Sequence, residues 1–265
     1  MSRLSDLFAT LRACDEKALI TFITAGDPNA ERTVEIVVTL AAAGADAVEI
    51  GIPFSDPLAD GPSIQASSQR ALHEGMTVRK ALHAVQRIRE LCPNLPIILM
   101  TYYNPILRYG LENYAADAKL AGVDAHIVTD LTPEEAAPWN LYSHKEGLDA
   151  IYLLAPTSTE ERIQKAANIS GGFIYCVSRT GVTGAREDIP RELPDVVSRI
   201  RKATDLPICV GFGVSEPEHI RAISNFADGV VVGSALVNLI HREKDSENLL
   251  VQVREYISGL KAATR

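Results

Sequence analysis

No apolar run in this sequence approaches the ~20 residues that a membrane-spanning helix needs. The segment Met1–Leu11 carries Arg3 and Asp6 where a signal peptide would have an apolar core. There are 26 basic residues against 34 acidic ones, a formal net charge of −8, and no block of lysine and arginine interleaved with aromatic residues. The composition therefore predicts neither a membrane nor a nucleic acid as partner. It predicts a soluble protein of the cytoplasm, or of an organelle stroma if the chain is a processed form.

The sequence patterns of metal, disulfide and serine-nucleophile chemistry are absent as well. The four cysteines, Cys14, Cys92, Cys176 and Cys209, are far apart and form no C-x-x-C pair, so we expect reduced thiols in the core. The six histidines form no pair with ligand spacing, which predicts no metal site. No G-x-S-x-G segment supports a Ser-His-Asp triad.

Short apolar runs with strand character recur along the whole chain and alternate with helical patterns. The expected strands are Leu19–Ile23, Ala47–Ile50, Ile97–Met100, Ala125–Val128, Ala150–Leu154, Phe173–Val177, Ile208–Val210 and Gly229–Val232. Eight βα units in about 250 residues predict an α/β fold of the (β/α)8 TIM-barrel type, as a single domain over residues 1–265. An open doubly wound sheet is the alternative, but no G-x-G-x-x-G follows the first strand.

The turns that lead from helix to strand resemble one another. Gly44, Gly122 and Gly147 each suit the end of a helix, and each is followed two residues later by an aspartate and a buried strand. A looser copy begins at Phe226. The sequence also predicts extra helices that would plug or flank the barrel. They are an N-terminal helix at Ser2–Arg12, a doubled segment after the second strand at Ile64–Leu91, and a C-terminal helix at Asn248–Lys261.

Glu49 interrupts the otherwise apolar second strand. Removing an ionised glutamate from water costs several kcal/mol unless it is paired, and no arginine or lysine occurs in its motif. A general acid is therefore favoured over a member of a buried ion pair. Three prolines and a glycine restrict the loop that follows, which holds Asp60 in few positions. Alone, Asp60 would be an ordinary turn residue; beside Glu49 it predicts a cleft with two carboxylates.

Glycines follow the last two expected strands, at Gly211-Phe212-Gly213 and at Gly233-Ser234. Backbone N–H groups in such turns bind phosphate without a cationic side chain, and a helix dipole beginning at Ser234 adds to the attraction. A third glycine cluster, Arg179–Gly184, follows the sixth strand and could close over a ligand. The alternative is that these glycines only serve tight turns. Their coincidence on strands seven and eight favours a phosphate site.

Several of these motifs, in order along the chain, resemble the tryptophan synthase α subunit family. They are Glu49–Pro62, Tyr103-Asn104-Pro105, Asp130-Leu131, Ser178–Gly184 and Gly211–Ser215. The resemblance implies a (β/α)8 barrel and a lyase that cleaves indole-3-glycerol phosphate into indole and D-glyceraldehyde 3-phosphate, in the last steps of L-tryptophan biosynthesis. It also implies an α2β2 complex, in which indole passes to a β subunit that carries pyridoxal phosphate. The α chain itself would use no cofactor and no metal.

The resemblance also implies roles for single residues. Glu49 matches the acid/base that moves both protons of a retro-aldol reaction, Asp60 the carboxylate that holds the indole N–H, and Tyr175 a tyrosine near the glycerol hydroxyl. Substrate contacts are implied for Phe22, Met100, Ile127 and Phe212 around indole, for Gly184, Gly213, Gly233 and Ser234 around phosphate, and for Thr183 as a hydrogen-bond partner of Asp60. In the loop after the second strand, Pro53 and Asp56 are expected to be exposed and to face the β subunit.

Three residues depart from the family pattern: Met100 stands where leucine is common, Thr129 where a smaller residue is usual, and Thr132 where a proline follows Asp130-Leu131. Two other functions compete with this interpretation. One is a different barrel enzyme acting on a phosphorylated sugar or aminosugar, which the two-carboxylate loop disfavours. The other is a non-catalytic homologue that only binds a partner, against which Glu49 and Asp60 argue.

Overall fold

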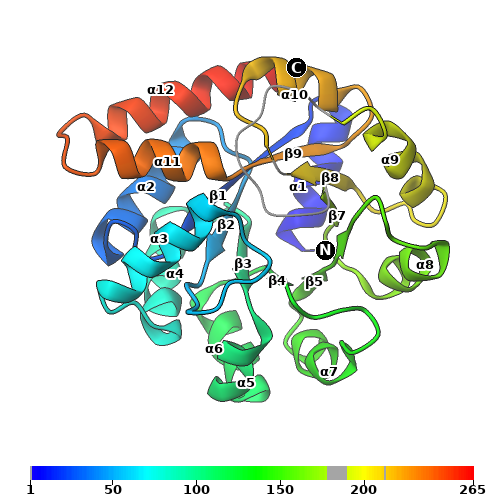
Figure 1. Cartoon of the computed structure of the whole chain (residues 1–265), viewed down its shortest axis with the longest axis horizontal. Coiled ribbons are helices and arrows are strands. Elements are labelled where there is room, and N and C mark those ends of the chain that lie inside the picture. The colour runs from blue at the N-terminus through cyan, green and yellow to red at the C-terminus, as the bar shows by residue number, and fades with distance from the viewer. Residues whose placement is uncertain (1, 178–189, 212) are drawn as a thin grey trace.

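The computed structural model of the chain describes residues 2–177, 190–211 and 213–265. Within these ranges nine parallel strands form one sheet, in the order β5-β4-β3-β2-β1-β9-β8-β7-β6. The sheet curls into a barrel surrounded by helices (Figure 1). The strands are β1 (Ala18–Thr24), β2 (Ala47–Gly51), β3 (Ile97–Thr101), β4 (Ala125–Val128), β5 (Asp149–Ile151), β6 (Leu153–Leu154), β7 (Ile174–Val177), β8 (Ile208–Gly211) and β9 (Gly229–Val232).

The fifth predicted strand, Ala150–Leu154, is wrong as a single element, because it divides into β5 and β6 at Tyr152. The first part pairs only with β4 and the second only with β7, so the sheet ladder changes partner at this residue. The Tyr152 hydroxyl donates to Oδ1 of Asn140 at 2.6 Å, on a helix outside the barrel. β5 and β6 together occupy one of eight positions around the barrel. The chain itself joins the two ends of the sheet, which excludes the open doubly wound alternative.

The helices follow the predicted alternation, and the three expected additions are present. The helices are α1 (Arg3–Ala13), α2 (Ala30–Ala42), α3 (Pro62–His73), α4 (Val78–Leu91), α5 (Tyr103–Tyr109), α6 (Leu111–Ala121), α7 (Ala137–Lys145), α8 (Glu160–Ile169), α9 (Leu193–Arg201), α10 (Pro217–Ser224), α11 (Ser234–Glu243) and α12 (Leu249–Lys261), with a final 3-10 turn η1 (Ala262–Thr264). The doubled segment after β2 is the pair α3 and α4. No helix in the described ranges is long and apolar enough to cross a bilayer.

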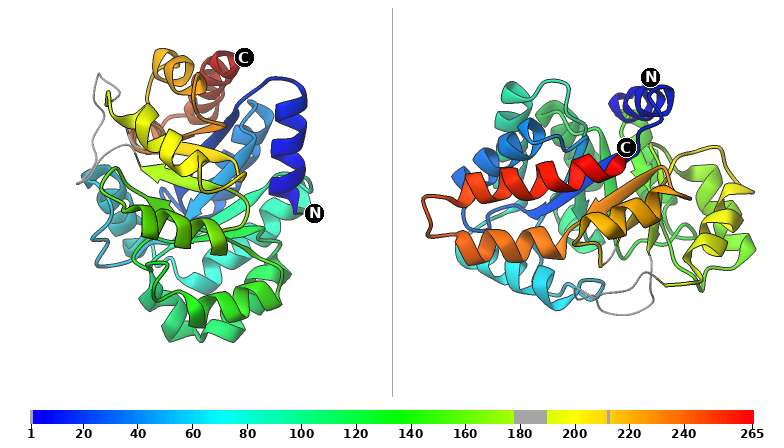
Figure 2. Two further views of the ribbon diagram at one scale, coloured as in Figure 1. Left: turned by 90° about the vertical axis from the view of Figure 1, so that its right-hand side faces the viewer. Right: turned by 90° about the horizontal axis from the view of Figure 1, so that it is seen from above.

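The first helix plugs one end of the barrel, as the sequence predicts. Leu4, Phe8 and Leu11 of α1 are buried and belong to the same apolar cluster as side chains from the barrel interior. The ring of Phe8 meets Phe173 edge to face, with 5.9 Å between centroids. Figure 2 shows α1 standing apart from the ring of outer helices. Because this end is closed by packing, the opposite end, where the strands finish, is left for a ligand.

The recurring aspartate before a strand has a structural task at the plugged end. Asp46, Asp124 and Asp228 each accept a hydrogen bond from a backbone N–H of the preceding strand in the sheet, at 2.7, 2.9 and 2.8 Å. All three also meet cations: Arg89 lies 2.7 Å from Asp124, Lys261 lies 2.8 Å from Asp46 and Arg201 lies 2.6 Å from Asp228. These carboxylates lock the start of one strand to its neighbour.

The cysteines only partly match the prediction of core thiols. All four are free; Cys176 and Cys209 are buried in strands, as expected. Cys92 is half-buried, and for Cys14 the prediction is wrong because this residue is exposed. Cys14 caps the C-terminus of α1, beyond the buried face of that helix.

Candidate active site

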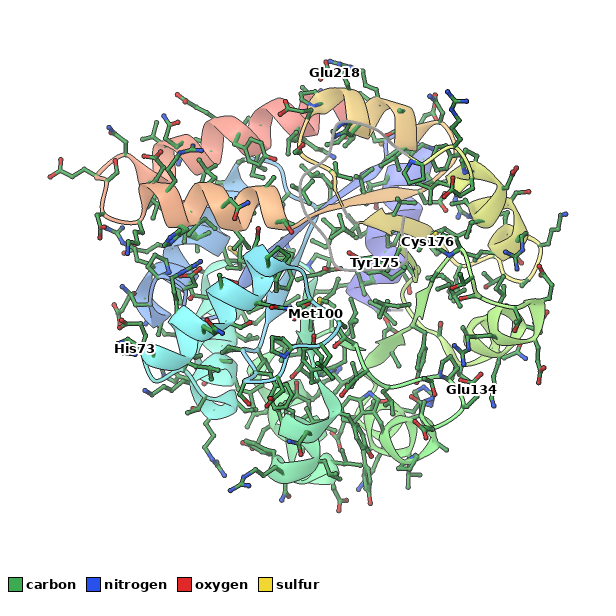
Figure 3. The ribbon with its side chains drawn as sticks, viewed as in Figure 1. His73, Met100, Glu134, Tyr175, Cys176 and Glu218 are labelled. Carbon is green, nitrogen blue, oxygen red and sulfur yellow. The ribbon has the colours of Figure 1, made fainter. Side chains whose placement is uncertain are left out.

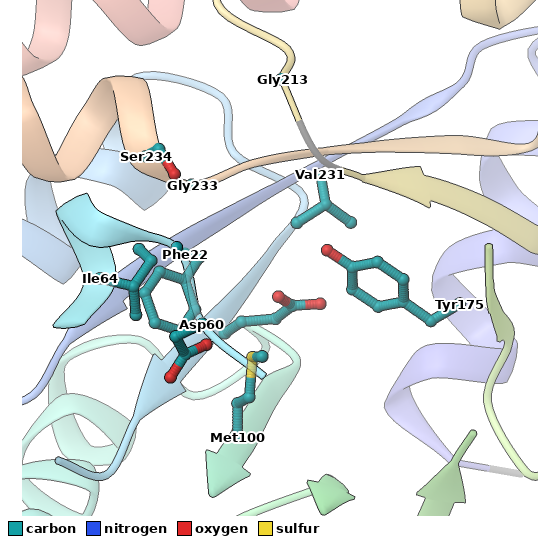
Figure 4. A pocket seen from close by; sticks show the side chains of 11 residues that line it. Phe22, Asp60, Ile64, Met100, Tyr175, Gly213, Val231, Gly233 and Ser234 are labelled. Atoms are coloured by element: carbon teal, nitrogen blue, oxygen red, sulfur yellow. The ribbon is translucent and has the colours of Figure 1, made fainter. Parts of the chain in front are cut away.

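A pocket of about 450 Å³ opens at the C-terminal ends of the strands (Figure 4). Its lining consists of Phe22, Glu49, Asp60, Gly61, Ile64, Met100, Tyr175, Gly213, Val231, Gly233 and Ser234. These residues come from strands β1, β2, β3, β7 and β9, from helices α3 and α11 and from connecting loops. Figure 3 shows Met100 and Tyr175 near the middle of the molecule, whereas His73, Glu134 and Glu218 lie at its rim.

Glu49 lies in β2, in register with Phe22 of β1 and Ile98 of β3. Its exposed fraction is 0%, and neither carboxylate oxygen has a hydrogen-bond partner among the described residues. Burial raises the pKa of Glu49 to about 8, since the charged form loses its hydration and gains nothing in return. At neutral pH the group therefore holds a proton that it can give to a ligand. The sequence prediction of a buried, unpaired carboxyl group is confirmed.

Asp60 also faces the pocket and is 8% exposed. The hydroxyl of Tyr102 donates to its Oδ2 at 3.0 Å, and Gln65 Nε2 donates to its backbone carbonyl at 2.8 Å. Burial raises the pKa of Asp60 to about 6, while the bond from Tyr102 works in the opposite direction. The predicted cleft with two carboxylates is therefore present, and the carboxyl groups differ: Asp60 is ionised at neutral pH and Glu49 is not.

Tyr102 is a residue near the site that sequence reasoning missed. It is 4% exposed and immediately follows β3. A polar side chain at the C-terminal end of a barrel strand is a signal that could have identified it. Its neighbour Tyr103 belongs to the Tyr103-Asn104-Pro105 motif, which does not include Tyr102.

Tyr175 stands opposite Asp60 across the pocket, and Figure 4 shows its hydroxyl directed into the space between them. It is 5% exposed, and burial together with the nearby Glu49 raises its pKa well above the ordinary value. The phenol therefore stays protonated and can donate a hydrogen bond. A Cβ atom on Gly211 would overlap this hydroxyl, so glycine in β8 is what lets Tyr175 lie there.

The apolar part of the pocket agrees in part with the predicted indole wall. Phe22 and Met100 line it, together with Ile64 and Val231, which the sequence did not single out. Ile127 does not line the pocket; it is fully buried in the interior cluster that also contains the α1 side chains. Its contact with substrate stays a prediction. Of the three departures from the family pattern, Met100 lines the pocket, whereas Thr129 and Thr132 do not.

Gly213, Gly233 and Ser234 gather at one side of the pocket, where α11 begins (Figure 4). A Cβ atom on Gly213 would meet nothing within 4 Å, so the space beside it is open to a ligand. No arginine or lysine is among the described lining residues. Backbone N–H groups and the N-terminus of α11 are thus what this side offers to an anion.

Some predicted residues lie outside the described ranges or differ from expectation. Thr183, Gly184 and Phe212 are not among the described residues. Asp56 is exposed as expected, but the expectation that Pro53 is exposed is wrong, because Pro53 is buried. The chain still follows the sheet just before it, since the Ile52 N–H donates to the Met100 carbonyl at 2.8 Å.

Fold and pocket together define a (β/α)8-barrel enzyme that presents two buried carboxyl groups at the C-terminal end of its barrel. Residues 8–265 match the family described as tryptophan synthase alpha chain. The chain belongs to this family, which confirms the resemblance found in the sequence motifs.

Individual relatives agree over almost their whole length. The tryptophan synthase alpha chain of Geobacter sulfurreducens is 51% identical over 99% of this chain and 99% of its own. That of Burkholderia thailandensis is 45% identical over 99% and 97%. Among solved structures, the alpha chain of Legionella pneumophila has a TM-score of 0.91 at 36% identity, covering 100% of this chain and 97% of that one. Tryptophan synthase of Mycobacterium tuberculosis has a TM-score of 0.91 at 38% identity, covering 100% and 98%.

Proposed function

We propose that this chain cleaves indole-3-glycerol phosphate into indole and D-glyceraldehyde 3-phosphate, and that the reaction takes place between Glu49 and Asp60. The observation that carries this assignment is the fully buried Glu49, whose carboxyl group has no hydrogen-bond partner among the described residues. Such a group costs folding free energy, and groups of this kind are typical of sites that need a raised pKa for acid–base chemistry.

Breaking the bond between indole C3 and the glycerol chain needs two proton transfers. Neutral Glu49 donates a proton to C3, which places a positive charge on the indole nitrogen. The resulting carboxylate then accepts the proton of the adjacent glycerol hydroxyl. The electrons of the broken carbon–carbon bond return to the indole ring, and the hydroxyl carbon becomes the aldehyde carbon. Glu49 ends the cycle protonated, as it began.

Asp60 and Tyr175 assist this step from opposite sides of the pocket. Ionised Asp60 accepts a hydrogen bond from the indole N–H and stabilises the positive charge that develops on the indole nitrogen. In a site shielded from water this is an effect of several kcal/mol. Tyr175, protonated because its pKa is raised, is near the glycerol hydroxyl and orients it. Phe22, Met100 and Ile64 supply the apolar surface for indole.

The phosphate lies against the glycine side of the pocket, on backbone N–H groups of Gly213, Gly233 and Ser234. The dipole of α11 favours a dianion there without a cationic side chain. Gly184 adds to this cradle and Thr183 bonds to Asp60. Phe212 completes the indole wall with Ile127.

We place the chain in the cytoplasm as the α subunit of an α2β2 complex, in which it hands indole to a β subunit that holds the pyridoxal phosphate. The loop that carries Asp56 is the contact surface nearest to the catalytic carboxylates. Leu58 in this loop is 89% exposed and adds an apolar side chain to the proposed contact surface. Pro53, which the family resemblance also assigns to this contact, is buried at the start of the loop.

The decisive experiment is release of indole from indole-3-glycerol phosphate, measured with the chain alone and with a matched β subunit. We expect slow release by the chain alone and an increase of at least tenfold when β is bound. A non-catalytic homologue would bind β but release no indole. A barrel enzyme for another phosphorylated sugar would release no indole from indole-3-glycerol phosphate, either alone or with the β subunit.

A further inference from the structure

The hydroxyl of Tyr102 makes two contacts with the same short loop. It accepts a hydrogen bond from the Ala59 N–H at 3.0 Å and donates one to Asp60 Oδ2 at 3.0 Å. Both bonds end on consecutive residues, so a single oxygen atom sets the course of the backbone and the orientation of the carboxylate. In the part of the chain that the structure describes, no other side chain donates a hydrogen bond to the Asp60 carboxylate.

Tyr102 is itself held by the barrel, because it follows β3 directly and precedes α5. On its other side, the Tyr103 N–H donates to Asp130 Oδ1 at 2.7 Å, in the loop after β4. Asp60, in contrast, lies on a loop that connects β2 to α3. Because Tyr102 is fixed at the ends of β3 and β4, its bond to Asp60 fixes the position of that loop residue relative to the barrel.

The ring of Tyr102 has a second contact, with Phe54. Their centroids are 5.3 Å apart and the rings are tilted by 34°. Phe54 is half-buried, and its loop carries the exposed Asp56 and Leu58. One side chain therefore touches both the partner-facing loop and the catalytic carboxylate.

We propose that Tyr102 is the positioning residue for Asp60 and that, through Phe54, it links the orientation of this carboxylate to the partner-facing loop. The inference rests on the proposed function of the pocket. Tyr102 does not touch the reacting atoms. It sets where the Asp60 carboxylate points, and a misplacement of about 1 Å at such a group costs about 100-fold in rate.

The electrostatics of the pocket agree with this role. The titratable groups that face Asp60 are Glu49, neutral at pH 7, Tyr175, and Tyr102 itself; no cation is among the described lining residues. The Tyr102 bond is therefore the contact that favours the ionised form of Asp60, against the larger effect of burial.

The test compares Tyr102→Phe with Tyr152→Phe. Each substitution removes one buried phenol hydroxyl and its bond to a side-chain acceptor, but Tyr152 bonds to Asn140 outside the barrel. Tyr102→Phe also leaves the Ala59 N–H without its acceptor, so its free energy of unfolding should fall at least as far as that of Tyr152→Phe in urea. Only Tyr102→Phe should lower kcat, by about ten- to 100-fold, with a smaller change in KM. The acid limb of its pH–rate profile should move to higher pH, because Asp60 loses the donor that favours its ionised form.

A titration of carbon-13-labelled aspartate by NMR provides a readout that does not depend on activity. The pKa of Asp60 should rise above its value of about 6 in Tyr102→Phe and stay unchanged in Tyr152→Phe. An unchanged Asp60 titration in folded Tyr102→Phe overturns the positioning role. If the wild type releases no indole with β bound, the proposed function is wrong. The titration still tests whether the Tyr102 hydroxyl stabilises the ionised form of Asp60.

The link to the partner-facing loop is tested with Phe54→Ala, with Phe54→Leu as the conservative variant. The increase in rate that bound β produces should shrink in Phe54→Ala and recover in Phe54→Leu. If bound β increases the rate of Phe54→Ala as much as that of the wild type, the link to the partner-facing loop is overturned. The role of Tyr102 in positioning Asp60 is then still tested by the Asp60 titration.

Discussion

Two buried carboxyl groups at opposite ends of the barrel, Asp124 and Glu49, lie in opposite environments. At the plugged end Asp124 is 6% exposed and accepts from Arg3 at 2.8 Å, from Arg89 at 2.7 Å and from a backbone N–H at 2.9 Å. At the open end Glu49 is more deeply buried and has no partner among the described residues. A carboxylate with three donors stabilises the fold, and a carboxyl group without any destabilises it. The difference separates the end that holds the barrel together from the end that does chemistry.

The largest expected effect comes from the unpaired group. Glu49→Gln keeps the size and polarity of the side chain but cannot transfer a proton, so we expect a loss of at least about 10²–10⁴-fold in kcat. The free energy of unfolding should rise at neutral pH, because folded Glu49 holds a proton that the unfolded state has lost, a cost that glutamine does not carry. Steady-state indole release and urea unfolding measure the two quantities. A kcat within a few-fold of the wild type would remove Glu49 from the mechanism.

The same isosteric change at the other end should give the reverse result. Asp124→Asn leaves Arg89, whose side chain is 13% exposed, without its anionic partner. Breaking such a pair lowers the free energy of unfolding by about 3 kcal/mol. We expect kcat of the folded variant to stay within a few-fold of the wild type. If Asp124→Asn reduced kcat as much as Glu49→Gln does, the division between the two ends would be wrong.

A smaller effect is expected at the glycine side of the open end. Gly233→Asp places a negative charge beside the proposed phosphate position, and we expect KM to rise at least about tenfold. Gly233→Ala is the matched control for bulk, since a Cβ atom there would lie 3.6 Å from the nearest atom of Phe22, an ordinary contact. Inhibition by glycerol phosphate should weaken in parallel with KM. An unchanged KM in Gly233→Asp would place the phosphate elsewhere.

The pH dependence of stability gives the sharpest comparison. The pKa of Glu49 is about 8 in the folded chain against 4.5 when exposed, so between these values the folded state holds a proton that the unfolded state has lost. The free energy of unfolding therefore falls as pH rises from 4.5 to about 8. This slope should be absent from Glu49→Gln and retained in Asp124→Asn. Identical pH–stability curves for wild type and Glu49→Gln would contradict the raised pKa.

Activity should respond to the same groups. Substrate cleavage needs Asp60 ionised and Glu49 protonated at the start, so kcat/KM should rise through about pH 6 and fall through about pH 8. Because the two groups share one pocket, the two limbs of the profile give apparent pKa values that belong to the pair. A profile that stays flat through pH 8 would exclude proton donation by Glu49 as the first step.

Much of the fold could be predicted because it depends on local patterns. Alternating apolar strands and amphipathic helices predicted the right order of elements, and the ends of the three added helical segments were correct to within a few residues. The fifth strand failed because its division at Tyr152 depends on which neighbour each half pairs with, and the residues themselves are equally apolar on both sides. The prediction for Pro53 failed for a similar reason: proline suggests an exposed turn, but the backbone still bonds to β3 at Ile52, and Pro53 next to it is buried.

The sequence by itself determined that Glu49 would be a carboxyl group without a local partner, since the residues around it in the strand and the following loop contain no cation. It also determined the glycine turns and the family to which the chain belongs. Only the tertiary structure decided that Tyr102, 42 positions beyond Asp60, would donate a hydrogen bond to the Asp60 carboxylate, and that Ile127 would lie in the interior cluster and not among the lining residues of the pocket. Such contacts depend on strand register and on the curvature of the closed sheet, and these arise from packing between elements far apart in the chain.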